Sequence, residues 1–264
     1  MTSVTSGFTR SRARQAVVAL AALGSLLLAL RLGGWQLERA MQKTALQNVI
    51  ESRSSEPALE GAAVLATNAE AAAAQHHRRL RIGGQWLPAH TVYLDNRQMG
   101  GRPGFYVITP LRLDDGTALL VQRGWQARDF QQRERVQEVP TPAGRVELEG
   151  RIAPPPARLY AFALGETGRI RQNLELEPFA RESGLNLRPL SLMLTEPRGR
   201  PGVSGALGAL GADGLQRDWP APAAGVGKHH GYAAQWFALA ALIFVLYVWF
   251  QLIQPRRAGR RQPP

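Results

Sequence analysis

Two long apolar runs lie close to the two ends of this chain. The second run, from Tyr232 to Ile253, contains no charged residue, and as a helix with a rise of about 1.5 Å per residue it is roughly 33 Å long. That length is enough to cross a hydrocarbon core of roughly 30 Å. The first run, from Ala16 to Leu30, follows three arginines and is closed by Arg31, a side chain that can reach the interface. The pattern predicts two transmembrane helices.

Each run has a second interpretation. The second run has the composition of a helix buried in a large soluble core, although the aromatic and basic residues at its end favour a membrane span. The first run is either an uncleaved anchor or a cleaved signal peptide, and no convincing small-x-small cleavage site precedes Trp35. The leader before it has no acidic residue and is rich in Ser and Arg, a composition also found in mitochondrial transit peptides. We favour the uncleaved anchor.

The basic residues set the expected topology. Arginines precede the first run and follow the second, and such residues stay on the cytoplasmic side of a membrane. We therefore expect both termini on the cytoplasmic side. The predicted division is a basic tail (1–15), a first span (16–34), an extracytoplasmic domain (35–231), a second span (232–253) and a second basic tail (254–264).

The domain between the spans has the pattern of a β structure. Five short runs rich in Val, Ile, Leu, Tyr and Trp are separated by Gly, Pro, Asn or Asp, at residues 79–87, 91–98, 104–113, 118–126 and 145–152. Asp114-Asp115-Gly116 predicts a hairpin between two of them. Most of the intervening segments have no helical pattern, which favours a mainly antiparallel sheet or a partly closed barrel. The predicted fold class is a membrane α+β protein, with two transmembrane helices flanking this domain.

Other segments of the domain have weaker patterns. Residues 57–75 are rich in Ala and Glu and predict a linker or a weak helix, residues 173–183 a short helix, and residues 190–195 a further strand. Residues 198–227 are rich in Gly, Pro and Ala and predict a poorly ordered approach to the second span.

The composition narrows the function. The formal net charge is +12, but the two tails carry seven of these charges beside the spans, so no nucleic-acid partner is expected. The chain has no cysteine, which excludes thiol catalysis, disulfides and Cys-based metal transfer, and with only four methionines it does not resemble a copper chaperone. We find neither a Ser/His/Asp order nor a phosphate-binding glycine loop, and therefore expect no enzyme.

Several polar residues need an interpretation of their own. His76 and His77 could suggest a metal site, but no carboxylate pair completes a ligand set, so we expect a solvated turn. The segment Arg123-Gly124-Trp125 is expected to end a strand, with Gly124 in a tight turn. Its Arg and Trp side chains then either face a partner or ligand or have a purely structural role.

Two faces at the outer ends of the spans stand out. If the second helix begins a turn before Tyr232, then His229, Tyr232 and Trp236 lie at i, i+3 and i+7 and share one face. After the first span, an indole and two cations recur every four residues, at Trp35, Arg39 and Lys43. An imidazole and cations at a membrane boundary are either a ligand site or ordinary interfacial residues.

Three blocks of sequence together resemble the surfeit-locus family of cytochrome c oxidase assembly factors. They are Leu32-Gly33-x-Trp35-Gln36-x-x-Arg39-x-x-x-Lys43 at the first span, Arg102-Pro103-Gly104-x-x-Val107-x-Thr109-Pro110-Leu111 with Val121-x-Arg123-Gly124-Trp125 in the domain, and Lys228-His229-x-Gly231-Tyr232-Ala233-x-Gln235-Trp236 at the second span. Their order and their placement against the two spans extend the resemblance over nearly the whole chain.

The resemblance implies a membrane protein without catalytic turnover that binds haem a and aids its insertion into the catalytic subunit of a haem–copper oxidase. The residue implied as the axial ligand of the haem iron is His229, with His230 as the alternative. An imidazole is a suitable axial ligand. The remaining haem-contacting residues expected here are Tyr232, Trp236, Lys228 and Arg39, with Lys43 as a further cation for the propionates.

The expected partners are the catalytic oxidase subunit and membrane lipid, with the machinery that makes haem a as a further candidate. The expected location is the bacterial inner membrane, ahead of the mitochondrial one. The main alternative is a two-span scaffold that stabilises oxidase subunits during assembly without binding haem. Because that scaffold needs the same topology and the same sequence blocks, the sequence leaves both open.

Overall fold

The computed structural model describes residues 5–129, 131, 136–156, 159, 167–195, 213–221 and 224–254. The chain divides into two compact units. One unit comprises Met1–Gln47 together with Ala221–Pro264 and contains the two apolar runs, and the other is Asn48–Pro220 and contains the β structure. Two long apolar helices flanking a mainly antiparallel sheet domain along the chain confirm the predicted fold class.

The two apolar runs are both helical. Helix α1 (Thr5–Ser55) contains the first run, and helix α4 (Val226–Tyr247) continues into the π-helical segment η2 (Val248–Ile253) to contain the second. Both helices are long and apolar enough to cross a membrane, and only 11% and 6% of their most apolar windows are buried. A core helix of a soluble protein would be mostly buried, so the soluble alternative for the second run does not hold.

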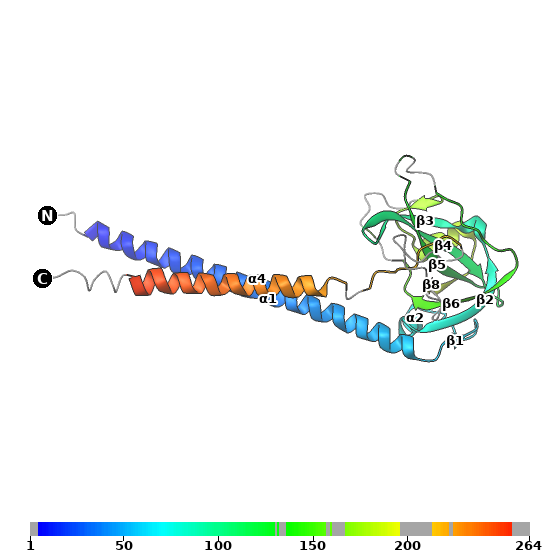
Figure 1. The fold of residues 1–264 in the computed structure, drawn as a ribbon, viewed down its shortest axis with the longest axis horizontal. Coiled ribbons are helices and arrows are strands. Elements are labelled where there is room, and N and C mark those ends of the chain that lie inside the picture. Colours follow the sequence, from blue (N-terminus) through cyan, green and yellow to red (C-terminus); the bar gives the residue numbers. More distant parts are fainter. Residues whose placement is uncertain are drawn as a thin grey trace. The chain divides into compact units, whose positions relative to one another are not determined.

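Helices α1 and α4 lie side by side and run antiparallel (Figure 1). Gln36 contacts His229, and Lys43 contacts Ala224, so increasing residue numbers on α1 meet decreasing numbers on α4. The N-terminal end of α1 and the C-terminal end of η2 therefore lie at the same end of the pair, which is the arrangement that a two-span topology with both termini on one side requires.

Buried and half-buried side chains form a seam with alternating spacings of three and four residues on each helix. On α1 the seam positions are Ala19, Ala22, Leu26, Ala29, Gly33, Gln36, Ala40 and Lys43, and on α4 they are Val226, His229, Ala233, Trp236, Ala240, Ile243 and Tyr247. This is the spacing of a coiled-coil seam. Several of the positions hold Ala or Gly, the residues that let helices pack closely in a membrane.

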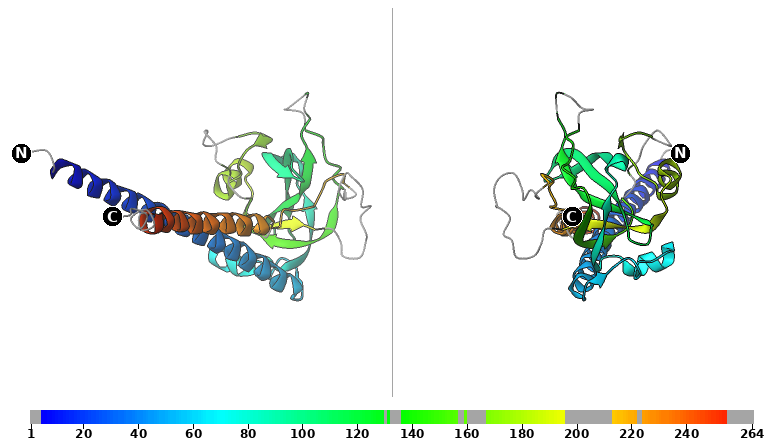
Figure 2. Two further views of the ribbon diagram at one scale, coloured as in Figure 1. Left: turned by 60° about the vertical axis from the view of Figure 1, so that its left-hand side comes forward. Right: turned by 90° about the vertical axis from the view of Figure 1, so that its right-hand side faces the viewer.

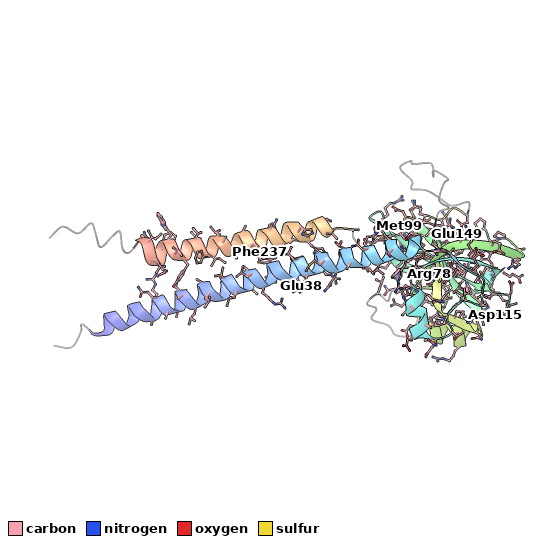
Figure 3. The ribbon with its side chains drawn as sticks, turned by 90° about the horizontal axis from the view of Figure 1, so that it is seen from below. Glu38, Arg78, Met99, Asp115, Glu149 and Phe237 are labelled. Atoms are coloured by element: carbon pink, nitrogen blue, oxygen red, sulfur yellow. The ribbon has the colours of Figure 1, made fainter. Side chains whose placement is uncertain are left out.

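Gly33 is a point of close approach in this seam. A Cβ atom at this position would lie 2.7 Å from Cε1 of Phe237, which packs against α1 from α4 (Figure 3). A Cβ atom at the neighbouring Gly34 would meet nothing within 4 Å. Only the first glycine of the Gly33-Gly34 pair is therefore required by helix packing.

In its described residues the β unit contains an eight-stranded sheet, two short helices and a 3-10 turn (Figure 2). The elements are β1 (Leu59–Glu60), α2 (Ala69–Gln75), β2 (Arg79–Trp86), η1 (Pro88–His90), β3 (Val92–Met99), β4 (Arg102–Arg112), β5 (Ala118–Ala127), β6 (Arg145–Ala153), β7 (Ile170–Arg171), α3 (Leu176–Ser183) and β8 (Leu187–Leu194). The strand order is β1-β2-β6-β8-β5-β4-β3-β7. An additional pairing of β2 with β4 closes β2, β6, β8, β5 and β4 into a ring, which is the partly closed barrel expected from the sequence.

Each of the five ring strands contributes apolar side chains to one core. That core contains Leu80, Ile82 and Trp86 of β2, Leu111 of β4, Leu119 and Val121 of β5, Ile152 of β6, and Leu190, Leu192 and Leu194 of β8. Alternate residues point to the outer face of the sheet. There Leu120 and Ile108 pack with Leu94 under Phe179 of α3, so α3 covers part of the outer face.

The element boundaries agree with most of the predicted ones. All five predicted strands form, and the hairpin at Asp114-Asp115-Gly116 joins the antiparallel strands β4 and β5. The last strand begins three residues earlier than expected, and the short helix begins at Leu176 instead of residue 173. Three strand pairs are parallel, namely β1 with β2, β3 with β7, and β5 with β8.

The segment expected to be poorly ordered is only partly covered by the described residues. Residues 198–212 lie outside them, but residues 213–221 pack on the sheet, where Gln216 forms an isolated bridge with Trp125. The prediction was therefore wrong for this part, because two backbone hydrogen bonds between Gln216 and Trp125 and the buried side chain of Leu215 hold it.

The segment Arg123-Gly124-Trp125 lies within β5, so the expected strand end and tight turn do not form there. The Arg and Trp side chains are 2% and 1% exposed, which supports the alternative of a purely structural role over that of a partner-facing or ligand-facing surface. The Arg123 guanidinium donates to Pro140 O and Thr141 Oγ1 and lies 4.8 Å from the ring centroid of Trp86. Gly124 makes no turn; a Cβ there would lie 2.8 Å from Gln216 O, so it admits the 213–217 segment.

Candidate functional site

The candidate site lies at the beginning of α4, where its first turns meet α1. Helix α4 begins at Val226, after Gly225 in the left-handed conformation (φ 79°). His229 is therefore inside the helix, as the shared face with Tyr232 and Trp236 requires. Of these three residues, His229 and Trp236 are half-buried on the seam, whereas Tyr232 is 51% exposed.

A side-chain hydrogen bond joins His229 to the other helix. Its Nδ1 lies 2.7 Å from Gln36 Oε1. An amide oxygen can only accept, so the imidazole donates through Nδ1–H and carries an unprotonated Nε2 when it is neutral. Gln36 thus selects the tautomer and limits the rotation of the ring.

Gln36 is the residue of this site that the sequence did not reveal. It belongs to one of the blocks that carry the family resemblance, but no role was expected for it. The spacing of Trp35, Arg39 and Lys43 drew attention to a neighbouring face of α1. Since Gln36 is four residues before Ala40 and three after Gly33, the small-residue seam was the signal that places it toward α4.

The predicted cations take different positions around this pair. Lys43 is half-buried and its Nζ donates to Ala224 O at 3.2 Å, just before the first turn of α4. Arg39 is exposed and donates to Gln42 Oε1 at 3.2 Å on its own helix. Lys228 is exposed. Lys43 therefore holds the helix ends together, and Arg39 and Lys228 remain accessible from outside.

The two adjacent histidines differ in their surroundings. His230 is exposed, whereas His229 is half-buried and oriented by Gln36. Among the described residues no group of three His, Asp or Glu side chains gathers to hold a metal ion.

The other histidine pair, His76 and His77, occupies a partly buried turn of the β unit. Their ring centroids are 6.1 Å apart, and the interplanar angle is 63°. Burial lowers the pKa of both imidazoles, and Arg53 lowers the pKa of His76 further. A turn forms here as predicted, but it is half-buried and not solvated, and His77 Nδ1 and His76 Nε2 are buried.

The fold and the helix seam define a two-span membrane protein with a β-barrel-like domain between its spans. The model of the SURF1 family matches residues 23–241, which include the parts of α1 and α4 that form the site and the entire β unit. The chain belongs to the SURF1 family.

Individual relatives support this assignment. A SURF1-like protein of Rickettsia felis is 26% identical over 239 residues, which cover 87% of this chain and 94% of the relative. A SURF1-like protein of Rickettsia bellii is 27% identical over 232 residues, covering 86% and 88%. A SURF1-like protein of Dictyostelium discoideum is 32% identical over 106 residues, covering 38% and 39%.

Proposed function

We propose that this protein is an assembly factor of a haem–copper terminal oxidase that binds haem a at the outer end of its second span and aids haem insertion into the catalytic subunit. Membership of the SURF1 family, known for oxidase assembly factors, supports the assembly role. The observation that carries the haem-binding part is the hydrogen bond between His229 Nδ1 and Gln36 Oε1.

The chemistry of His229 fits an axial ligand of haem iron. A ligating imidazole must be neutral and offer a lone pair, and its other nitrogen usually donates to an oxygen acceptor that fixes the ring. Gln36 supplies this acceptor, so His229 is already in the tautomer with a free Nε2. Bound haem would supply the iron centre, and the protein would supply orientation and a place at the membrane boundary.

The surroundings of His229 fit the rest of a haem molecule. Trp236 lies about two turns further toward the middle of the span and is half-buried. Tyr232 is exposed and lies between the two positions, so both rings can contact a flat apolar ring. The exposed cations Lys228 and Arg39 are available for propionates, and Lys43 keeps the ends of the two helices together. His230 is the alternative ligand, without an oriented ring.

The location follows from the same topology. We infer a bacterial inner membrane protein with both termini in the cytoplasm, because arginines precede the apolar run of α1 and follow that of α4 in the sequence. The β unit is then extracytoplasmic. The proposed partners are the catalytic oxidase subunit and membrane lipid, and the proposed role involves no catalytic turnover.

The test is the absorption spectrum and pyridine haemochrome of the full chain, purified from membranes that make haem a. We expect a haem a signal that is lost in His229→Ala and retained in His230→Ala. If the haem a signal is lost only in His230→Ala, the axial ligand is His230 and not His229. If the wild-type protein carries no haem while its deletion still abolishes oxidase assembly, the result supports the scaffold function and contradicts haem binding.

A further inference from the structure

A buried arginine on the outer face of the β unit has no described carboxylate partner. Arg97 is 6% exposed and follows an irregularity in the pairing of β3 with β4, between Leu94 and Arg97, where Asn96 adopts a left-handed conformation (φ 57°). Irregularities of this kind redirect a side chain out of the regular alternation of a strand. Here the redirected side chain is a guanidinium, the group that is always charged in proteins.

The described contacts of Arg97 leave its charge unneutralised. One terminal nitrogen donates to Gln172 O at 2.8 Å, the guanidinium carbon lies 5.8 Å from the ring centroid of Tyr106, and Nε is buried without a hydrogen-bond partner. The preceding acid, Asp95, is ion-paired with Arg128 instead. Burial lowers the pKa of Arg97, and no carboxylate of the described residues opposes that effect.

Such an arrangement is costly in a folded protein. A buried charge is normally paired, because a carbonyl and an aromatic ring replace only part of the hydration that the ion loses. The other buried arginines of this unit follow the rule: Arg123 is ion-paired with Asp213, and Arg171 with Glu182. Arg97 is therefore a place where an anion from outside the described structure would be stabilised.

Arg97 also lines a pocket with room for such a ligand. The pocket has a volume of about 540 Å³ and lies across β3, β4, β5, β8 and the end of β6, with Tyr106, Gln122, Met193, Ala153 and Pro155 among its lining residues. Gln122 donates to Ser191 Oγ at 2.7 Å, so its amide is held in place. The lining combines one cation with mostly apolar surface, the composition expected for a small-molecule site.

We propose that this pocket binds a carboxylate attached to a compact apolar group, with Arg97 receiving the carboxylate. A carboxylate matches the planar guanidinium and can accept from its terminal nitrogens. The apolar group would lie on Tyr106, Met193 and the proline-rich segment after β6. Its source is either a free carboxylic acid or the chain terminus of a partner, since both offer the same chemistry. The proposal does not depend on haem binding at His229.

The first experiment uses wild-type full chain in detergent and a pair of isosteric probes. Benzoate and neutral benzamide are titrated separately by isothermal calorimetry. We expect saturable binding of benzoate and at least about tenfold weaker binding of benzamide, because only benzoate neutralises the guanidinium. Equal affinities, or no binding of either probe up to tens of millimolar, would refute the proposal without any variant.

The second experiment tests whether Arg97 is the residue that binds the carboxylate. In Arg97→Met we expect benzoate affinity to fall at least about tenfold, with a melting temperature no lower than wild type because a buried unpaired charge is removed. The matched control is Arg112→Met, at an exposed arginine on β4, which should bind benzoate like wild type. Unchanged benzoate binding in Arg97→Met would overturn the assignment.

A short apolar peptide with a free C-terminus and its amidated form distinguish the two sources of the carboxylate. Tighter binding of the free-ended peptide than of benzoate assigns the site to a partner's chain terminus. Tighter binding of benzoate assigns it to a small acid, and either result supports the carboxylate site.

Discussion

His229 Nδ1 and Gln36 Oε1 lie 2.7 Å apart, although 193 positions separate the two residues in the chain. The bond is formed at the point where two antiparallel helices meet, between a residue from each seam. It determines which nitrogen of the imidazole carries the proton, and therefore which nitrogen is available to a ligand. Position 36 is thus a positioning residue for whatever binds at His229.

In the proposed haem site, replacing Gln36 should weaken haem retention although the iron ligand His229 is still present. In Gln36→Leu the imidazole loses its acceptor, so both tautomers become populated and the ring can rotate. Loss of such a supporting partner typically costs about 10–100-fold in metal affinity. We expect haem occupancy, measured by pyridine haemochrome at limiting haem, to fall by about this factor. In Gln36→Glu the acceptor is kept and becomes anionic, so haem should be retained and its reduction potential should decrease.

The control for this experiment is Gln42→Leu on the same helix. Gln42 is exposed and accepts from Arg39 without contacting His229, so its replacement should leave haem occupancy unchanged. If Gln36→Leu and Gln42→Leu behave alike while His229→Ala loses haem, the ring needs no support from α1. If none of the three changes matters, the site itself is elsewhere.

The packing of α1 against α4 should depend on Gly33 and not on Gly34. A Cβ at position 33 would overlap Phe237 Cε1, whereas the same atom at position 34 meets nothing within 4 Å. Overpacking in a well-packed contact costs about 1–3 kcal/mol. We expect Gly33→Ala to lower the melting temperature of the full chain in detergent, Gly34→Ala to leave it unchanged or raise it, and Gly33→Ala combined with Phe237→Ala to recover part of the loss. Equal effects of the two single substitutions would contradict the proposed seam.

The strands and spans were predictable because their signals are local. An apolar run of sufficient length and the period-two alternation of residues such as Val146 and Leu148 need no knowledge of a partner. The roles of Gln36, Arg97 and Arg123 were not predictable for the opposite reason. Each depends on a contact far along the chain, to His229, Gln172 and Asp213 respectively. In the sequence, a charged residue of a strand that is buried in the folded sheet cannot be distinguished from one on the surface.

The guanidinium of Arg123 should be essential to the stability of the β unit. It binds Pro140 O, Thr141 Oγ1 and Asp213 from inside the sheet, and its side chain is 2% exposed. Removing one member of a buried ion pair costs about 3–5 kcal/mol. We expect Arg123→Met to lower the unfolding midpoint strongly in denaturation of the full chain followed by near-ultraviolet circular dichroism.

Arg145 provides the comparison for that substitution. It has two carboxylate partners, Asp114 and Glu147, where Arg123 has one, but its side chain is 54% exposed. Because exposed ion pairs contribute little, Arg145→Met should leave the midpoint nearly unchanged. A small effect at both positions would mean that the buried network around Arg123 is dispensable.

The β unit should lose stability in mildly acidic solution because of the turn at His76 and His77. Burial lowers the pKa of both imidazoles in the folded chain, with Arg53 near both and Arg151 near His77 adding to the effect. In the unfolded chain their pKa is about 6.5. Protons therefore bind the unfolded state more tightly, so this contribution to stability is complete above about pH 6.5 and is lost as the pH falls from there toward the folded values.

The substitutions His76→Gln and His77→Asn should reduce this pH dependence. Asparagine is chosen at position 77 because that residue has a φ of 73°, which Asn tolerates better than most residues. We expect the melting temperature of the double variant to change less between pH 7.5 and pH 5 than that of wild type. If the double variant keeps the full slope, other groups cause the acid sensitivity, and the turn at His76 and His77 tolerates protonation.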